Sequence, residues 1–254
     1  MLFRSFEVNN WNCYHPLHAD RHVIKNVSLR VNAGEVVGIA GLMGSGRTEL
    51  AMSLFGRAWG QKISGEIKIR SAPADVSSIP KAMKAGMAYA TEDRKTYGLV
   101  LIDHIKHNAT LANLEGVSSR MVIDDQRELS IANKYRKELA IRSSGVFQTT
   151  VNLSGGNQQK VVLAKWLFSN PDVLILDEPT RGIDVGAKYE IYGIINELAA
   201  AGKAVIVISS EMPELLGISD RIYVMNEGRF VAEMPTREAS QEKIMRAIMK
   251  SWDE

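Results

Sequence analysis

The sequence has little cysteine, few aromatic residues and no long apolar run. Cys13 is its only cysteine, which excludes an intrachain disulfide and leads us to expect a reducing compartment. No apolar stretch approaches the roughly 18 residues of a membrane-spanning helix, and residues 1–7 lack the apolar segment of a secretory signal. We therefore expect any membrane role to be exercised through a partner.

The chain also lacks a strong charge of either sign. Its formal net charge is +2 over 254 residues, and Lys and Arg are scattered rather than gathered in a basic run. A nucleic-acid partner is therefore not expected. The length allows one large domain or two small lobes.

Glycine is concentrated in residues 41–48, which read Gly-Leu-Met-Gly-Ser-Gly-Arg-Thr. This is the pattern G-x-x-x-x-G-K-[ST] of a phosphate-binding loop, with Arg47 in place of Lys. An apolar run, 35–40, predicts a strand before the loop, and residues 48–55 predict a helix after it. Strand, loop and helix in this order are the context that the motif requires.

The chemistry of this loop follows from its small residues. Glycines let the backbone turn tightly and expose its N–H groups, and the following helix N-terminus attracts anions. Thr48 offers a hydroxyl to Mg²⁺. The simpler interpretation is a glycine turn before a helix, with no ligand. The candidate nucleotide-binding residues here are Gly41, Gly44, Ser45, Gly46, Arg47, Thr48 and Glu49.

Two carboxylates follow a second apolar run. Residues 173–176 predict a buried parallel strand, and Asp177 and Glu178 come directly after it. Ligands of parallel sheets bind beyond the carboxyl ends of the strands. We expect Asp177 near Mg²⁺ and Glu178 as the general base that polarises an attacking water. Two solvated carboxylates at a strand end are the simpler alternative.

A third segment, Leu153-Ser-Gly-Gly-Asn-Gln-Gln159, predicts a helix start. Ser154 is a good N-cap, and the helix should run from Gly155 to about Phe168, before Asn170-Pro171. Small residues at a helix start make a second anion-binding end. Taken alone, the segment would fit a flexible helix entry equally well.

Hydrophobic periodicity predicts several further elements. These are an antiparallel strand at 65–70, a charged helix at 126–141, a helix at 186–200, a hairpin of 221–225 with 229–233, and a C-terminal helix at 240–250. In the last helix Ile244, Met245, Ile248 and Met249 are expected to make core contacts.

With these motifs in this order, the chain resembles an ATP-binding cassette (ABC) ATPase domain. It resembles more narrowly the C-terminal cassette of the fused ATPases of bacterial monosaccharide importers of the ribose, galactose and xylose type. The narrower resemblance rests on residues 41–50, 91–95, 153–165 and 177–188. It implies an α/β fold with a P-loop NTPase core around a parallel sheet, an antiparallel β subdomain and an α-helical subdomain. Residues 1–254 would form one domain, with a core lobe at about 1–94 and 156–254 and a helical lobe at about 95–155.

The resemblance also implies roles for residues outside the loop. Leu153, Ser154, Gly155, Gly156, Asn157 and Gln158 match the signature that covers the γ-phosphate held by a partner cassette. Asp184 matches the loop that meets that partner, and Glu92 the coupling loop, where its carboxylate would also lie near the metal. Such cassettes stack an aromatic ring on adenine: Tyr14 is the candidate, with Trp11 and His15 as rivals. Packing of Tyr14 against the first sheet is an equal alternative.

Three positions depart from the general family pattern. Arg47 stands where the family has Lys, Ser210 where it usually has His, and Glu92 where it usually has Gln. Arg is a longer planar fork than Lys, and a hydroxyl neither spans the distance of an imidazole nor carries its charge. We therefore predict a site that binds ATP and Mg²⁺ but hydrolyses ATP slowly or not at all, with Glu178 and Ser210 as the catalytic positions.

The resulting hypothesis is the ATPase domain of a monosaccharide importer, weak in isolation. Its expected partners are a second cassette, fused N-terminally in a longer natural protein, membrane permease subunits and, indirectly, a sugar-binding protein. The expected location is cytoplasmic, on the inner face of the cell membrane. A non-hydrolytic regulatory half and a soluble ABC protein without a membrane partner are the alternatives.

Overall fold

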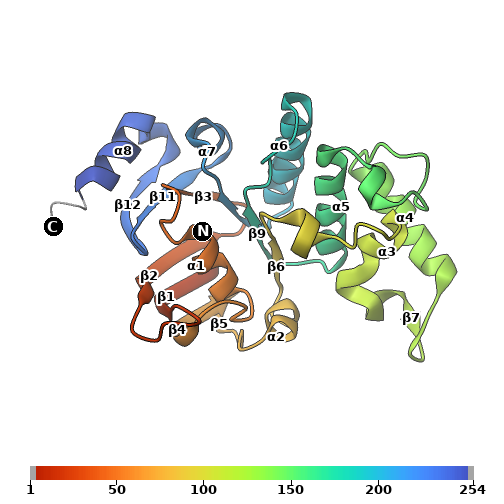
Figure 1. Ribbon diagram of the computed structural model, residues 1–254, viewed down its shortest axis with the longest axis horizontal. Coiled ribbons are helices and arrows are strands. Elements are labelled where there is room, and N and C mark those ends of the chain that lie inside the picture. Colours follow the sequence, from red (N-terminus) through yellow and green to blue (C-terminus); the bar gives the residue numbers. More distant parts are fainter. Residues whose placement is uncertain (1–3, 251–254) are drawn as a thin grey trace. The chain divides into compact units, whose positions relative to one another are not determined.

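The computed structural model describes residues 4–250, and its internal contacts divide the chain into two compact units (Figure 1). The core unit comprises Met1–Tyr89, Asp172–Glu178 and Ile195–Glu254, and the helical unit comprises Ala90–Pro171 and Pro179–Ile194. The lobe boundaries inferred from the sequence stay a prediction.

The core unit is built on a six-stranded sheet in the order β12-β11-β3-β10-β9-β6. Four neighbouring strands pair in parallel, in the order β11-β3-β10-β9. The edge strand β12 pairs antiparallel with β11. All residues of β3, β9 and β10 are buried, which is why their sequences are apolar runs without alternation. The strands are β3 Val36–Gly41, β6 Met87–Ala90, β9 Val173–Asp177, β10 Ala204–Ile208, β11 Arg221–Asn226 and β12 Arg229–Pro235. The predicted parallel core and hairpin are confirmed.

A second, antiparallel sheet in the core unit has the order β2-β1-β4-β5. Val8 of β1 pairs with Leu29 of β2 on one side and with Ile67 of β4 on the other. All three side chains are buried, so one face of this sheet forms part of the core. Its strands are β1 Arg4–Tyr14, β2 His22–Asn32, β4 Gln61–Ile69 and β5 Ala72–Pro73, and β4 contains residues 65–69 of the predicted strand.

Four helices complete the core unit: α1 Arg47–Leu54, α2 Ile79–Lys84, α7 Met212–Ile218 and α8 Gln241–Lys250. A short 3₁₀ turn, η4 Thr236–Glu238, precedes α8. In α8 the side chains of Ile244 and Ile248 are fully buried, as expected. The prediction for Met249 was wrong, because this residue is 57% exposed. One residue turns an α-helix by about 100°, which carries Met249 off the face shared by Ile244 and Ile248.

The helical unit contains α3 Ile105–Thr110, α4 Asp125–Glu138, α5 Gly155–Phe168 and most of α6 Val185–Ala200. A small hairpin of β7 Ser118–Ser119 and β8 Val122–Ile123 projects before α4, and the turns η1 Arg94–Gly98, η2 Leu111–Val117 and η3 Thr150–Asn152 connect the helices. Asp124 caps α4 by accepting hydrogen bonds from Gln126 N and Arg127 N. Ala140, with a φ of 47°, follows the helix end. The predicted helix at 126–141 is therefore confirmed, but it ends at Glu138 instead of residue 141.

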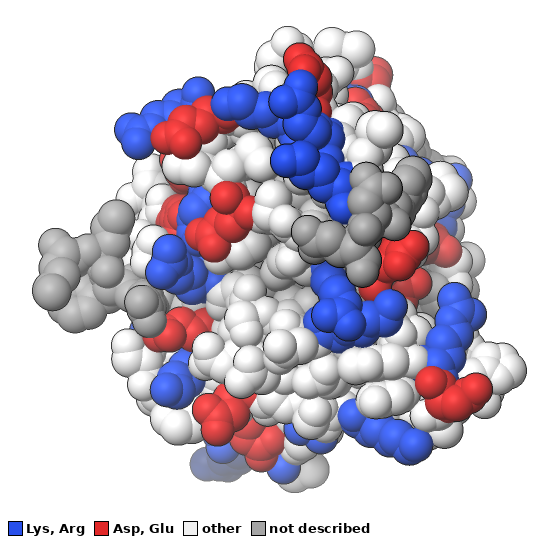
Figure 2. All heavy atoms as spheres, turned by 90° about the vertical axis from the view of Figure 1, so that its left-hand side faces the viewer, with Lys and Arg blue, Asp and Glu red and all other residues white. Residues whose placement is uncertain are grey.

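Between residues 4 and 250, no helix combines the length and the apolar character needed to cross a bilayer. On the face of the core unit that carries α8 and β12, basic and acidic side chains are intermixed (Figure 2). A hollow of about 810 Å³ there is lined by residues of β11, β12 and α8 together with Lys25. None of the residues predicted for the site lines this hollow.

Candidate nucleotide-binding site

The glycine-rich loop lies at the carboxyl end of β3 and leads directly into α1. Gly46 is the N-cap of α1 and has a φ of 102°, a left-handed conformation that side-chain-bearing residues rarely adopt. Ser45 N donates to Leu42 O at 3.0 Å, and Gly228 N donates to Ser45 O at 2.9 Å. These bonds order the loop, and its form leaves the first N–H groups of α1 free to bind an anion.

Asp177 ends β9 and is almost completely buried, with 1% of its surface exposed. Burial raises the pKa of its carboxyl to about 6, although the hydroxyls of Thr48 and Tyr89 and the charge of Arg47 favour the ionised form. Tyr89, on β6, donates to Asp177 Oδ2 at 2.9 Å. The sequence reasoning missed Tyr89, whose only signal was a hydroxyl-bearing residue in a short apolar strand.

Two of the four buried side-chain oxygens of the core unit that have no hydrogen-bond partner among the described residues belong to the predicted nucleotide site. They are Ser45 Oγ in the glycine loop and Asp177 Oδ1. A buried polar atom without a partner is costly and commonly marks the place of a ligand, ion or water. A hydroxyl and a carboxylate oxygen are donors that Mg²⁺ prefers. The residues present therefore fit a bound nucleotide with its magnesium ion.

Glu178 is held in an unusual conformation next to Asp177. Its φ is 48°, and its N–H donates to Ile208 O at 2.8 Å. Ser210 donates its hydroxyl to Glu178 Oε2 at 3.1 Å. Burial raises the pKa of Glu178, while Ser210 and Arg47 oppose the rise. A strained, partly buried carboxylate with a raised pKa is well suited to accept a proton.

Arg47 is directed toward the strand ends. Its Nη1 donates to Ser209 O at 2.6 Å, and its Nη2 lies 3.7 Å from Glu178 Oε1. The side chain is only 9% exposed, and this burial lowers the pKa of the guanidinium. Arg47 thus holds the ends of β9 and β10 together and neutralises the carboxylate predicted as the general base.

The three candidates for adenine stacking have different surroundings. Trp11 is 1% exposed and donates its indole N–H to Ser53 Oγ at 3.0 Å, so its ring belongs to the core. Tyr14 is partly exposed and stacks on His22 with centroids 4.4 Å apart and an interplanar angle of 5°. His15 lies edge-on to Trp59. Tyr14 remains the better candidate of the three.

In the helical unit, Ser154 caps α5 as predicted. Its Oγ accepts hydrogen bonds from Asn157 N at 3.5 Å and from Asn157 Nδ2 at 2.8 Å. Leu153 and Gln158 are buried, and Gln158 donates to Thr150 O at 3.1 Å. Ser154 itself is exposed. The helix start therefore presents the Ser154 hydroxyl to solvent, next to the buried side chains of Leu153 and Gln158.

Gly156 is required by packing in this unit. A Cβ at this position would lie 2.5 Å from Ala187 Cβ, on the first turn of α6. A contact this short forces one of the two helices to move. The second glycine of the signature thus permits the close approach of α5 and α6.

Glu92 and Asp184 also lie in the helical unit, where both have local partners. Glu92 forms an ion pair with Arg181, and Arg94 Nη1 donates to Arg181 O at 3.0 Å. Asp184 Oδ1 accepts from Ala187 N at 2.9 Å, which orders the start of α6. The metal role of Glu92 and the partner contact of Asp184 stay predictions.

Comparison with known proteins identifies the family. The ABC transporter family matches residues 24–181, and the chain belongs to this family. It is 56% identical to the L-arabinose transport ATP-binding protein AraG of Geobacillus stearothermophilus over 246 aligned residues. These residues make up 97% of this chain and 48% of AraG. It is 51% identical over 240 residues to the xylose import ATP-binding protein XylG of Thermoanaerobacter pseudethanolicus, covering 94% of this chain and 47% of XylG.

A ribose import ATP-binding protein, RbsA of Clostridium tetani, is 48% identical over 227 residues, which are 89% of this chain and 45% of RbsA. The chain thus spans about half the length of the curated relatives that it matches. Among solved structures, a nucleotide-free ATP-binding cassette from an ABC transporter superimposes with a TM-score of 0.79 at 20% identity, covering 97% of this chain and 95% of that one. The α/β fold of an ABC ATPase is therefore confirmed.

Proposed function

We propose that this chain is the ATP-binding domain of an ABC importer for monosaccharides and that its own nucleotide site is degenerate. The observation that carries the proposal is the identity of 48–56% to three sugar import or transport ATP-binding proteins over 89–97% of the chain. The names of these relatives differ in the sugar, so the sugar itself is left open. A pentose is the first class to test.

The core unit would hold ATP with Mg²⁺. Main-chain N–H groups of residues 41–48 would bind the phosphates, while Thr48 and Asp177 would hold the magnesium ion, which neutralises phosphate charge when bound. The partnerless Ser45 Oγ and Asp177 Oδ1 support this assignment. Glu178 would accept a proton from the attacking water, and Tyr14 would lie under the adenine.

The contacts of Arg47 support the degenerate site. Burial raises the pKa of Glu178, but Arg47 lies against one of its carboxylate oxygens and Ser210 donates to the other, so an attacking water would have to displace one of these contacts. Binding of ATP in a productive form would require Arg47 to leave Glu178 and Ser209 O. We infer slow hydrolysis by the isolated domain, well below typical enzyme rates of roughly 1–10³ s⁻¹.

The signature at the start of α5 would act on the site of a second cassette. We propose that this second cassette precedes the chain in one longer protein, because the chain covers only 45–48% of the relatives' length. Permease subunits in the cell membrane and a sugar-binding protein would complete the importer. The domain would then work at the cytoplasmic face of the membrane.

The test is uptake of labelled arabinose, xylose and ribose by cells that carry the complete natural gene with its permease genes. Uptake of one of these sugars that disappears when the gene is deleted, and returns with the gene, would support the proposal. Normal uptake of all three in the deletion strain would contradict pentose import. A natural gene of only 254 codons without a neighbouring cassette gene would contradict the fused arrangement.

A regulatory half that binds ATP without hydrolysing it is the second candidate, and the ion pair of Arg47 with Glu178 favours it. The two candidates are separated by single-turnover hydrolysis of ATP in the full protein whose other cassette carries a Glu→Gln change at its own base. Residual turnover that is lost when Glu178→Gln is added would identify this domain as hydrolytic. No residual turnover would identify it as regulatory.

A further inference from the structure

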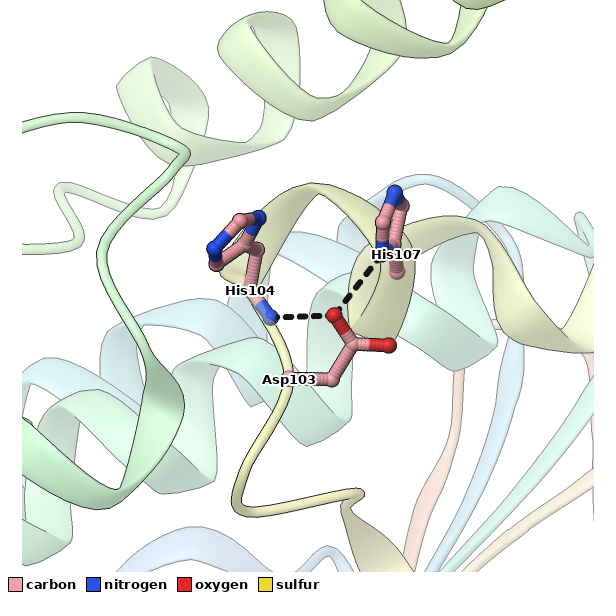
Figure 3. Close-up of side chains that lie close together, drawn as sticks. All are labelled: Asp103, His104 and His107. Atoms are coloured by element: carbon pink, nitrogen blue, oxygen red, sulfur yellow. Dashed lines mark hydrogen bonds and ion pairs between the residues drawn. The ribbon is translucent and has the colours of Figure 1, made fainter.

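The helical unit contains a cluster of metal-ligating side chains that the nucleotide site does not use. Asp103 and His104 precede α3, and His107 lies on its first turn. Each of the three offers one ligand atom, and these atoms lie within 4.8 Å of one another. Figure 3 shows one Asp103 oxygen in contact with the His107 ring and with the main-chain N–H of His104, whose own ring extends to the other side. Between residues 4 and 250, this is the one such group found.

The backbone that carries the cluster is fixed by main-chain hydrogen bonds. Thr150 N donates to Asp103 O at 3.0 Å, and Ile105 N donates to Gln148 O at 3.1 Å. His104 also forms an isolated bridge with Thr149. The cluster therefore rests on a braced turn, and a ligand needs to adjust side chains only.

The side chains are already close to an ion-binding arrangement. His107 Nδ1 lies 2.7 Å from Asp103 Oδ1, while the ligand atoms of one tetrahedral zinc ion, at about 2.1 Å from it, are about 3.4 Å apart. Small rotations of the side chains would lengthen the distance between His107 Nδ1 and Asp103 Oδ1 and shorten the wider distances, of up to 4.8 Å, between the other ligand atoms. His104 and His107 are both partly exposed, which gives an ion and a water ligand access from solvent.

The surroundings resemble the outer shell of metal sites, in which a carboxylate orients a ligating imidazole. Glu128 Oε2, on the buried side of α4, lies 3.9 Å from His107 Nε2. Lys106 Nζ lies 3.0 Å from the same oxygen, and Thr110 donates to the other Glu128 oxygen at 2.8 Å. Glu128 is thus neutralised and positioned. Asp103, whose Oδ1 accepts from His104 N at 2.7 Å and lies 2.7 Å from His107 Nδ1, is the carboxylate that contacts both histidines.

We propose that Asp103, His104 and His107 bind one divalent transition-metal ion of the zinc type, with water in the fourth position. Two imidazoles and one carboxylate suit Zn²⁺, Ni²⁺ or Cu²⁺ better than Mg²⁺ or Ca²⁺, which prefer oxygen ligands. The ion would tie the turn before α3 to the helix itself. This site is separate from the magnesium ion of the nucleotide and does not depend on the proposed transport function.

The test is titration of the 254-residue chain with ZnCl₂ against a chromophoric chelator, with excess Mg²⁺ present to fill oxygen-rich sites. We expect one Zn²⁺ per chain with a micromolar dissociation constant. His104→Ala and His107→Ala should each weaken binding at least tenfold. His18→Ala is the matched control, because His18 lies beside another histidine, His15, with ring centroids 4.9 Å apart, and it should change binding less than twofold.

A conservative variant and a spectroscopic signal keep the result independent of folding. His107→Gln can still donate to Asp103 but offers a poor zinc ligand, so it should fold, by circular dichroism and thermal melting, and lose zinc. Co²⁺ should give the visible absorption of a low-coordinate site in the wild type and not in His107→Gln. Absence of binding at 100 μM Zn²⁺, or wild-type affinity in His107→Gln, or loss of binding in His18→Ala alone, would overturn the proposal.

Discussion

The carboxyl edge of the core sheet and the start of α5 are both proposed to meet phosphate, but they are built from different groups. At the sheet edge, charged side chains bind one another: Arg47 pairs with Glu178, and Ser210 donates to the same carboxylate. At the start of α5, the Ser154 hydroxyl is exposed and accepts a hydrogen bond from Asn157 N. The first arrangement thus joins charged groups to one another, while the second leaves its hydroxyl accessible.

The two ends are held by different contacts, so a change at one end need not alter the other. The start of α5 depends on a cap and on the close approach of two helices, through Ser154 and through Gly156 against Ala187. Neither contact involves Arg47 or Ser210. We therefore expect changes at the two ends to have unequal effects, and four experiments measure these effects on transport, stability and ATP hydrolysis.

The largest effect is expected from Ser154→Asp. Asp caps helices as well as Ser does, so α5 should persist, but its carboxylate would face the partner's γ-phosphate. Two unit charges at 4 Å repel by about 4 kcal/mol at an effective dielectric constant of 20, which corresponds to a roughly 10³-fold loss of sugar uptake by the full transporter. Ser154→Asn, neutral and of equal shape, is the control and should lose far less. Equal losses in both would mean that charge at α5 is irrelevant.

The next effect concerns the sheet edge and pH. Folding raises the pKa of Asp177 from 3.8 to about 6, so its contribution to stability is complete below about pH 3.8 and is lost as the pH rises through 6. In Mg²⁺-free buffer at pH 7, Asp177→Asn should therefore be more stable than the wild type by about 3 kcal/mol. The difference should vanish near pH 4. Urea unfolding at both pH values measures it, and a destabilised variant at pH 7 would contradict the burial argument.

Gly156→Ala tests the packing of the signature helix. The added methyl group would lie 2.5 Å from Ala187 Cβ, and overpacking of this kind costs roughly 1–3 kcal/mol. The double variant with Ala187→Gly should recover part of the loss, reduced by the roughly 1 kcal/mol cost of glycine in a helix. A double-mutant cycle from urea unfolding gives the coupling. Strictly additive changes in the free energy of unfolding would show that residues 156 and 187 are not in steric conflict in Gly156→Ala.

The smallest effect is expected from restoring the sheet edge. Arg47→Lys with Ser210→His should raise ATP hydrolysis by the isolated domain roughly tenfold, since one well-placed donor is worth at least that much. Arg47→Lys alone should produce a smaller increase in the rate of ATP hydrolysis. Adding Glu178→Gln to the double variant should abolish the gain. Hydrolysis by the unaltered chain at ordinary enzyme rates would instead mean that the site is not degenerate.

The sequence by itself determined the family, the order of the elements and the types of residue at the site. Residues 41–48, the carboxylates after β9 and the Ser154 cap were recognisable because each motif lies within one short stretch of chain. Local spacing is enough to predict a loop before a helix or two acids after an apolar strand. Likewise, the buried strands were readable from their apolar runs.

Only the tertiary structure decided which side chains meet. The contact of Arg47 with Ser209 O spans 162 residues and that of Tyr89 with Asp177 spans 88, and parallel strands that adjoin in the sheet are far apart in sequence. The need for glycine at 156 arises from its contact with Ala187 of α6. Such contacts depend on packing between distant segments, which no local pattern records.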